Sequence, residues 1–361
     1  MQLNLPSKLL RVIAGCAVAS LVMVSTYSLM AHQSAGGLRL PEIHNGTFKM
    51  LEWSEFKPTW TTEQMEPRFA YAQYVTTLDY LCNAVINFGL LRRFGTKYDL
   101  VLIFPKAWSE GVRLQNSKEA KAMQKLQAAQ PDIYYRSFDV ISTNSGDATW
   151  RDSLTKFHSF ALTEWSRVLA FDSDALVLNN MDHFFLSPLA PIAVPRAYWL
   201  TEKGSNIAKQ ILGSHVMLLE PNEHRYRKIL DEAARSADFD MEVINHMFSD
   251  SAMILPHRRL ALLSGEFRKQ DHSQYMSPDE DEEWNAMGEV SRAYLVHFSD
   301  WPLPKPWKPR TKKQWEDALP ECRDDDVETA DKPKCADRFM WTGFYETYDH
   351  EKERQCERSQ L

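Results

Sequence analysis

The sequence has no excess of positive charge, few cysteines and no visible internal repeat. Its 42 lysines and arginines are outnumbered by 49 aspartates and glutamates, so the formal net charge at pH 7 is -7. That balance argues against a nucleic-acid-binding protein, because such proteins normally present a basic face. The lack of a fixed-period repeat argues against solenoid and propeller architectures.

What remains is the composition of a globular protein with alternating strand and helix patterns. The 361 residues are enough for one large α/β unit with appendages, and 44% of them are hydrophobic. From Arg68 onward, strands are expected at 69–77, 98–104, 138–141, 168–171, 215–220, 251–255 and 293–298, and helices at 78–94, 117–129, 154–167 and 222–237. This alternation predicts an α/β fold with a mostly parallel sheet covered by helices on both faces. Ligands of such folds bind outside the carboxyl ends of the strands.

The N-terminal region carries an apolar run behind two positive residues. Lys8 and Arg11 precede the run from Val12 to Ala31, which is about long enough to cross a bilayer as a helix. Because the positive residues come first, the sequence predicts a cytosolic tail at 1–8, a transmembrane signal anchor at 9–31 and an exported body. That is a single-pass type II membrane protein. The alternative is a cleaved signal peptide and a soluble secreted protein.

Residues 32–66 are expected to form a stem that contains the glycosylation sequon Asn45-Gly46-Thr47. The C-terminal extension at 311–361 is charged and has too little apolar sequence to order itself. A disulfide between Cys322 and Cys335 is therefore predicted there. Cys82 and Cys356 can pair or stay free, since spacing does not fix connectivity. The cysteines lack the spacing of a zinc site.

Two aspartates interrupt the apolar stretch "VLAFDSDALVL". In an extended segment, Asp172 and Asp174 point to the same side and Ser173 to the other. Carboxylate oxygens suit Mg²⁺ or Mn²⁺, which keep open positions for substrate phosphates. Without a metal the pair should repel, so Asp174→Asn is expected to stabilise the metal-free protein. The alternative is a turn in which both aspartates cap local backbone amides.

A second polar cluster follows another apolar strand, in "YLVHFSDWPLPKPWKPR". His297 ends the strand and can supply a third metal ligand, and Lys305 can place a positive charge against a phosphate. The alternatives are a histidine satisfied within the core and a lysine exposed to solvent.

Together these segments resemble glycosyltransferase family 8, the family of glycogenin and of many UDP-sugar transferases. The likeness runs from about Phe69 to Pro309. It covers "YVTTLDYLCNA", "LTKFHSFALTEWSRVLAFDSDALVLNNMDHFF", "DMEVINHMF" and "VHFSDWPLPKPW". The resemblance implies a single Rossmann-like nucleotide-sugar-binding domain of the GT-A type at 67–310. It also implies retention at the anomeric carbon and Mn²⁺ as cofactor, with Mg²⁺ as the alternative.

The resemblance also implies roles for individual residues. The metal ligands are Asp172, Asp174 and His297, and the catalytic candidates are Asp240 and Lys156. The substrate-binding candidates share a place in or beside the matched motifs; they are Thr76, Thr77, Tyr80, Lys156, Ser173, Gly213, Ser214, Asp240, Met241 and Lys305.

Three positions depart from the family pattern. Gly213-Ser214-His215 stands where the family has N-S/A-G, and Met241 stands in place of a glutamine. Both affect the choice of donor sugar; the glycine and the methionine are expected to make room for an acetamido group. Asp300 replaces a glycine and adds negative charge near the diphosphate, which is unfavourable unless its side chain points away.

Within the family, the anchored architecture most resembles fungal Golgi N-acetylglucosaminyltransferases, also called glucose N-acetyltransferases. The resemblance implies transfer of N-acetylglucosamine from a UDP-sugar donor to a glycan acceptor, on the lumenal side of the Golgi membrane. One alternative is a transferase of the same family that uses UDP-glucose or UDP-galactose. Another is a relative that binds a nucleotide-sugar or a glycan without turning it over.

Overall fold

In the computed structural model, the described residues are 40–44, 47–51, 67–109, 117–143, 151–200, 210–277, 282–322 and 333–357. The chain divides into two compact units, Met1–Glu66 and Pro67–Leu361. In the first unit, β1 (Leu40–His44) pairs antiparallel with β2 (Thr47–Leu51). The predicted anchor at 9–31 and residues 45–46 of the sequon lie outside the described residues. Every helix within those residues is too short or too polar to span a bilayer.

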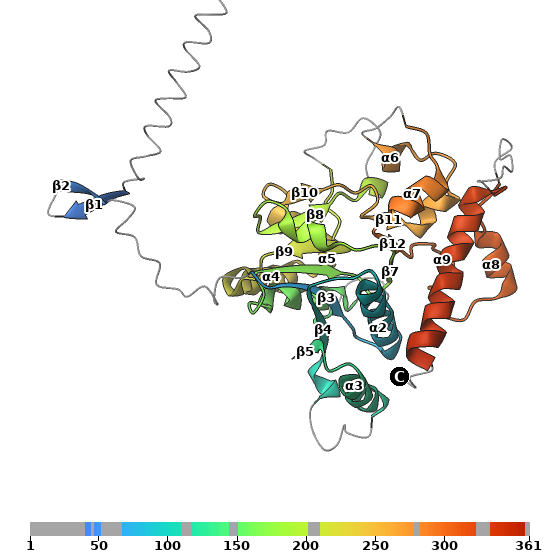
Figure 1. Cartoon of the computed structure of the whole chain (residues 1–361), viewed down its shortest axis with the longest axis horizontal. Helices are drawn as coiled ribbons and strands as arrows, with labels where there is room; N and C mark the ends of the chain where they lie inside the picture. Colours follow the sequence, from blue (N-terminus) through green and yellow to red (C-terminus); the bar gives the residue numbers. More distant parts are fainter. Residues whose placement is uncertain are drawn as a thin grey trace, which may run out of the picture. The chain divides into compact units, whose positions relative to one another are not determined.

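The second unit is built on a seven-stranded sheet with the order β10-β8-β9-β6-β3-β4-β5 (Figure 1). Its strands are β3 (Phe69–Tyr74), β4 (Asp99–Pro105), β5 (Ile133–Phe138), β6 (Arg167–Phe171), β8 (Ile192–Pro195), β9 (Val216–Leu219) and β10 (Met253–Leu255). All neighbouring pairs are parallel except those made by β9, which runs against both β6 and β8. The predicted mostly parallel sheet is confirmed, with one strand reversed.

Helices cover both faces of this sheet, as predicted, because side chains alternate along each strand. Leu100 and Leu102 of β4 point into the core beneath α2 (Leu78–Arg93), whereas Val101 and Ile103 point into a second core. The helices are α2, α3 (Lys118–Ala129), α4 (Glu223–Ser236), α5 (Asp240–Phe248), α6 (Ser273–Met276), α7 (Ala286–Arg292), α8 (Lys312–Ala318) and α9 (Ala336–Lys352). Side chains of α4 and α5 pack into the second core.

Two sequence predictions about secondary structure were wrong. The strand expected at 138–141 lies earlier, as β5, where "IYYRSF" pairs with β4 from Leu100 opposite Ile133. The helix expected at 154–167 is a 3₁₀ helix, Ser153–Ala161, and Arg167 is already the first residue of β6. Arg167 is held there by hydrogen bonds from its guanidinium to the carbonyl oxygens of Phe185 and Pro188.

A small three-stranded sheet joins two distant parts of the chain. It has the order β11 (Leu262–Leu263), β12 (Leu295–His297), β7 (Ala175–Val177). Strand β12 runs antiparallel to β7, with His297 opposite Ala175. Buried Asn87 of α2 fixes β7 by donating to the Ala175 carbonyl at 2.9 Å and accepting from the Val177 amide at 3.1 Å. This pairing brings the end of β12 to the residue that follows Asp174.

The C-terminal extension packs on the sheet domain and belongs to the same compact unit. Figure 1 shows α9 standing beside α2, and buried Trp341, Tyr345 and Tyr348 of α9 join the core under α2. The predicted Cys322–Cys335 disulfide is confirmed. Cys82 of α2 and Cys356, left open by the sequence, form a second disulfide.

Asp300 is directed into this packing. Its carboxylate accepts hydrogen bonds from the Trp341 indole and the Tyr345 hydroxyl, both at 2.9 Å, and from the Ser264 hydroxyl. Because the side chain is buried and its oxygens are committed to α9 and its surroundings, the added negative charge faces hydrogen-bond donors. The acidic residue therefore has a structural explanation: its hydrogen bonds connect the segment "VHFSDWPLPKPW" to α9.

We expect Asp300→Gly to destabilise the protein by about 3 kcal/mol, because it leaves the buried Trp341 and Tyr345 donors without an acceptor. Asp300→Asn is the matched control, since its amide oxygen still accepts one of these bonds, and its loss should be smaller. Urea unfolding measures both. A glycine variant as stable as wild type would contradict this role.

Candidate metal and substrate site

The reversed direction of β9 places its start against the end of β6. Val216, the first residue of β9, lies opposite Phe171, the last residue of β6. The Asp172 amide donates to the His215 carbonyl oxygen at 3.0 Å. The triplet that departs from the family pattern therefore lies directly beside the two aspartates.

The extended segment expected at 172–174 is a turn between β6 and β7, in which the Ala175 amide donates to the Asp172 carbonyl oxygen at 3.3 Å. Ser173 is engaged elsewhere in this turn. Its side chain is buried, and its hydroxyl donates to the Tyr74 carbonyl oxygen at 2.7 Å. Because this hydroxyl is engaged by β3, Ser173 contributes to holding the segment in place. Its assignment to substrate binding remains a prediction.

Asp172, Asp174 and His297 converge. The Nε2 atom of His297 lies 3.0 Å from Asp174 Oδ1 and 4.0 Å from Asp172 Oδ2. One potential ligand atom from each residue lies within 4.8 Å of the others. Two carboxylates and one imidazole form a donor set that suits a divalent cation. The three residues predicted as ligands are thus brought together by β6, β7 and β12.

A lysine accompanies each aspartate. Lys305 Nζ lies 2.8 Å from Asp174 Oδ2 and also donates to the Phe298 carbonyl. Lys156 Nζ lies 2.7 Å from Asp172 Oδ1 and 2.6 Å from Asp240 Oδ2, with its side chain only 4% exposed. Three carboxylates against two ammonium groups leave one net negative charge. A divalent cation would make the site positive, and a positive site attracts a diphosphate.

The two aspartates differ in their acidity. Burial raises the pKa of Asp172 above its usual value, although Lys156 opposes the effect. Burial acts in the same direction on Asp174, but His297 and Lys305 outweigh it and hold the pKa of Asp174 well below its usual value. In the metal-free protein, Asp172 is therefore the carboxylate that takes up a proton first as the pH falls.

Asp240 lies at the first turn of α5, and its carboxylate pairs with Lys156, which also pairs with Asp172. The Ser214 hydroxyl donates to Asp240 Oδ2 at 2.6 Å. Burial would raise the pKa of Asp240, but Lys156 and Ser214 outweigh it and keep the carboxyl ionised. Met241 follows on α5, half-buried. Asn245 lies in the matched segment "DMEVINHMF" but was given no role from the sequence; its amide donates to the Leu212 carbonyl oxygen at 2.9 Å and so fixes the residue before Gly213.

The predicted nucleotide-binding residues lie where β3 ends and α2 begins. Thr77 caps α2, its hydroxyl oxygen accepting from the Tyr80 amide at 3.3 Å. The Tyr80 ring meets Trp307 edge-on with centroids 5.4 Å apart. Burial raises the pKa of Tyr80, and the charges of Asp174 and Asp172 add to the effect. Thr76 is half-buried beside them. Strand β3 neighbours β6, so these residues share the carboxyl edge of the sheet with the aspartates.

His215 is the site residue whose role sequence reasoning missed. Its ring centroid lies 5.6 Å from that of His297, and the residue is buried. Burial, with smaller contributions from the nearby His297 and Lys156, lowers the pKa of His215 to about 3. The sequence did contain a sign of this role, because His215 stands where the family pattern has glycine.

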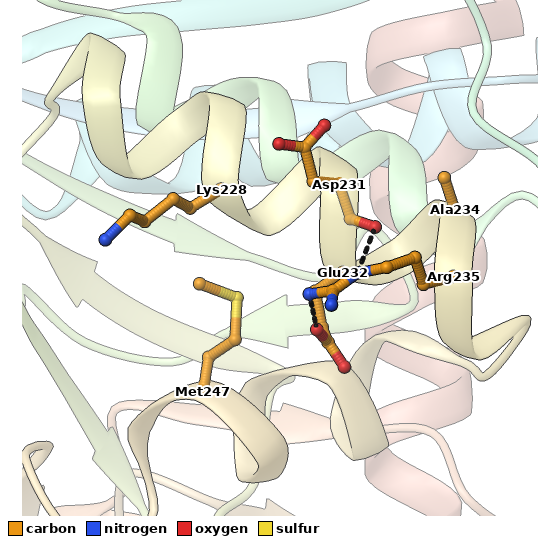
Figure 2. A pocket seen from close by; sticks show the side chains of 6 residues that line it. All are labelled: Lys228, Asp231, Glu232, Ala234, Arg235 and Met247. Atoms are coloured by element: carbon orange, nitrogen blue, oxygen red, sulfur yellow. Dashed lines mark hydrogen bonds and ion pairs between the residues drawn. The ribbon is translucent and has the colours of Figure 1, made fainter.

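A surface pocket between α4 and α5 has no part in this site. Figure 2 shows its lining, in which Arg235 hydrogen-bonds the Asp231 carbonyl and pairs with Glu232. The lining charges thus partly satisfy one another, and none of the lining residues is a predicted site residue. A smaller pocket includes Tyr74, Lys156, Asp172 and Ser214 and lies at the site described above.

Comparisons with known proteins found relatives in sequence and in structure. The chain is 39% identical over 292 residues to glucose N-acetyltransferase 1 of Gibberella zeae. The match covers 80% of this chain and 63% of that protein, so the chain spans less than two thirds of that relative. It is 36% identical over 298 residues to glucose N-acetyltransferase 1 of Aspergillus fumigatus, covering 78% of this chain and 75% of that protein. A solved structure of the galactosyltransferase LgtC with donor and acceptor sugar analogs matches 70% of this chain and 95% of that chain, with 13% identity and a TM-score of 0.48. No protein-family model matches.

These relatives define the class of protein as glycosyltransferase. More narrowly, the chain belongs to the family of fungal proteins named glucose N-acetyltransferase 1. The resemblance drawn from the motifs is thereby confirmed.

Proposed function

We propose that this glycosyltransferase moves N-acetylglucosamine from UDP-N-acetylglucosamine to a glycan acceptor, with retention at the anomeric carbon. The observation that carries the proposal is the convergence of Asp172, Asp174 and His297 at the carboxyl edge of the sheet, flanked by Lys156 and Lys305. Membership in the glucose N-acetyltransferase 1 family supports the choice of sugar. Nucleic acid has no part in the proposal.

The proposed mechanism rests on charges that are fixed before the donor arrives. A Mn²⁺ ion on Asp172, Asp174 and His297 would supply positive charge to the two phosphates as UDP departs. Lys305 adds positive charge beside Asp174, and the buried Lys156 does so beside Asp172. Asp240, kept ionised by Lys156 and Ser214, positions the sugar or stabilises positive charge at its anomeric carbon.

Mn²⁺ is the proposed metal because one ligand is an imidazole. Mg²⁺ prefers oxygen ligands in near-ideal octahedral geometry, whereas the set here is two carboxylates and one nitrogen. Mg²⁺ remains the alternative that a titration must compare. A relative without turnover has no chemical need for the full ligand set with both lysines, and this argues for an enzyme.

The proposed location is the lumenal side of the Golgi membrane. The chain order is a tail at 1–8, an anchor at 9–31, a stem at 32–66, a catalytic domain at 67–310 and an extension at 311–361. The disulfides Cys82–Cys356 and Cys322–Cys335 support export, because such bonds persist in oxidising compartments. Carbonate extraction of cell membranes tests the anchor; release of the full-length protein into the supernatant would contradict it.

The enzymatic proposal is tested by measuring UDP release from a panel of UDP-sugars with Mn²⁺. The expected result is release that depends on Mn²⁺ and is fastest with UDP-N-acetylglucosamine, with slower release from UDP-glucose. N-acetylglucosamine carries an acetamido group where glucose has a hydroxyl, and an apolar contact with the acetyl methyl discriminates by only about 1–3 kcal/mol, so some turnover of UDP-glucose is expected. A preference for UDP-glucose or UDP-galactose would contradict the donor assignment, and no release from any sugar would favour the non-catalytic alternative.

We expect His297→Ala to raise the Mn²⁺ concentration needed for half-maximal activity by about tenfold or more, because one of three ligands is lost. The ranking of UDP-sugars should stay unchanged, since His297 is assigned to the ion. Activity measured against Mn²⁺ for two donors checks both points. A changed donor ranking with an unchanged Mn²⁺ titration would show that His297 has been misplaced.

A further inference from the structure

The triplet Gly213-Ser214-His215 contains a buried polar atom that the protein leaves unused. His215 is 6% exposed, and its Nε2 atom is buried without a hydrogen-bond partner among the described residues. A buried imidazole nitrogen without a partner is costly, and such atoms in native proteins call for a ligand, a water molecule or strain as an explanation.

The His215 ring lies close to two other rings. Its centroid lies 5.4 Å from that of Trp199 and 5.6 Å from that of His297. Its Cε1 and Nδ1 atoms face Gly213, where an added Cβ would lie 3.1 Å and 3.2 Å from them. These distances are tighter than an ordinary van der Waals contact. The space opened by glycine at 213 is therefore already filled by the imidazole, and the expected room for an acetamido group does not lie there.

The residues around His215 indicate which part of a bound donor its Nε2 atom would approach. Its ring lies edge-on to that of His297, a residue of the metal group. The adjacent Ser214 donates to Asp240, and Lys156 pairs with both Asp240 and Asp172. In a nucleotide-sugar, the sugar follows the diphosphate directly. Under the proposed function, the diphosphate lies at the metal group and the sugar toward Asp240, so the sugar comes close to the triplet that contains His215.

We propose that His215 hydrogen-bonds the transferred sugar of the donor, and that Gly213 is glycine because the His215 ring needs its space. The proposal rests on the proposed function. A hydroxyl group both donates and accepts, so it can pair with Nε2 in either tautomer of the imidazole, and an acetamido group can do the same through its oxygen or its N–H. The residue is thus a donor-sugar contact, distinct from the groups assigned to the metal and the phosphates.

The test compares Mn²⁺-dependent binding of UDP with that of UDP-N-acetylglucosamine by titration calorimetry on the full chain. His215→Ala should weaken UDP-N-acetylglucosamine about fivefold to tenfold, the value of one hydrogen bond, and change UDP less than twofold. His215→Gln, which offers a polar group near the position of Nε2, should recover part of the loss. His215→Phe keeps a ring but no hydrogen bond and should not. Thermal unfolding of each variant verifies that it is folded.

The outcomes separate this proposal from the proposed function. If wild type fails to bind UDP with Mn²⁺, the proposed function is overturned and this proposal with it. If wild type binds UDP but the alanine variant loses UDP and UDP-N-acetylglucosamine equally, or loses Mn²⁺ affinity, His215 only positions His297 and the sugar contact is overturned. Binding of UDP-N-acetylglucosamine unchanged by any His215 variant would also overturn it.

The steric half of the proposal has its own test. Gly213→Asn alone should lower the thermal midpoint and weaken UDP-N-acetylglucosamine, because its Cβ meets the His215 ring. In combination with His215→Gly, which empties that space, the same change should cost less than it does in wild type. Such non-additivity is expected of residues in direct contact. Additive effects of the two substitutions would overturn the assigned reason for the glycine.

Discussion

Replacing Asp174 with asparagine is expected to abolish sugar transfer, lowering kcat/KM by about 10³-fold or more, because a bound cation contributes several kcal/mol to the transition state. An amide keeps the shape of the side chain but removes the charge that balances the ion. Asp174 also contacts His297 at 3.0 Å and Lys305 at 2.8 Å. The proposed ion, the imidazole ligand and the lysine assigned to the diphosphate therefore all depend on its charge. Measuring UDP-sugar turnover across a Mn²⁺ titration checks the loss; wild-type turnover at saturating Mn²⁺ would contradict it.

Asp172→Asn is the matched control, because both variants should lose activity while their stabilities change in opposite directions without metal. The charge of Asp174, whose pKa is depressed despite burial, stabilises the fold above the unfolded-state pKa and ceases to do so as the pH falls through the folded-state value. Burial raises the pKa of Asp172, so ionising it costs stability as the pH rises past the unfolded-state value. At pH 7 in EDTA, Asp174→Asn should therefore lower the free energy of unfolding and Asp172→Asn should raise it.

For Asp174, this prediction reverses the expectation drawn from the sequence. A repelling pair predicts that removing either charge stabilises the metal-free protein. In the structure the two aspartates differ in pKa. His297 and Lys305 lower the pKa of Asp174, whereas burial outweighs Lys156 and raises the pKa of Asp172. Equal changes in the two free energies of unfolding would contradict this difference.

Lys156→Met is expected to destabilise the protein by about 3–5 kcal/mol, since it leaves a buried ionic group without its partner. Lys156 is the common partner of Asp172 and Asp240, and its side chain is 4% exposed. Methionine retains most of the apolar stem, so packing changes little. Unfolding in urea measures the loss, and activity measured below the transition reports on the site separately.

Lys305→Met is the control for this prediction. Lys305 contacts only one carboxylate of the pair, and its side chain is 27% exposed, so water replaces part of the lost interaction. Its cost in stability should be clearly smaller, whereas its cost in activity should be large if it faces the diphosphate. Equal losses of stability in the two variants would contradict the role of Lys156 as a buried structural cation.

The sequence predicted most strands of the seven-stranded sheet, because apolar runs are local patterns, and it named the three residues that the structure brings together. His297 ends an apolar run, as the sequence indicated, but Asp172 and Asp174 converge through a turn between β6 and β7 and not through the period of an extended strand. The direction of β9 could not be predicted in this way, since it is set by pairing with β6 and β8 far along the chain. That direction decides that Gly213-Ser214-His215 meets the aspartates.

Other features depend on contacts between distant residues. Cys82 and Cys356 are separated by 274 residues, and spacing gave no reason to join them. The partners of Asp300 lie on α9, in an extension whose sequence predicted no core. Gly213 was interpreted as an empty space because only the orientation of the His215 ring reveals that the space is filled.

The central claim is that Asp172, Asp174 and His297 jointly hold a divalent cation that binds the donor diphosphate. Crystals of the protein soaked with Mn²⁺ and UDP, measured at the Mn absorption edge, test it most directly. The account predicts one anomalous peak coordinated by the three side chains and by phosphate oxygens of UDP, and no such peak in Asp174→Asn. UDP bound without manganese at these residues, or manganese bound elsewhere, would contradict it.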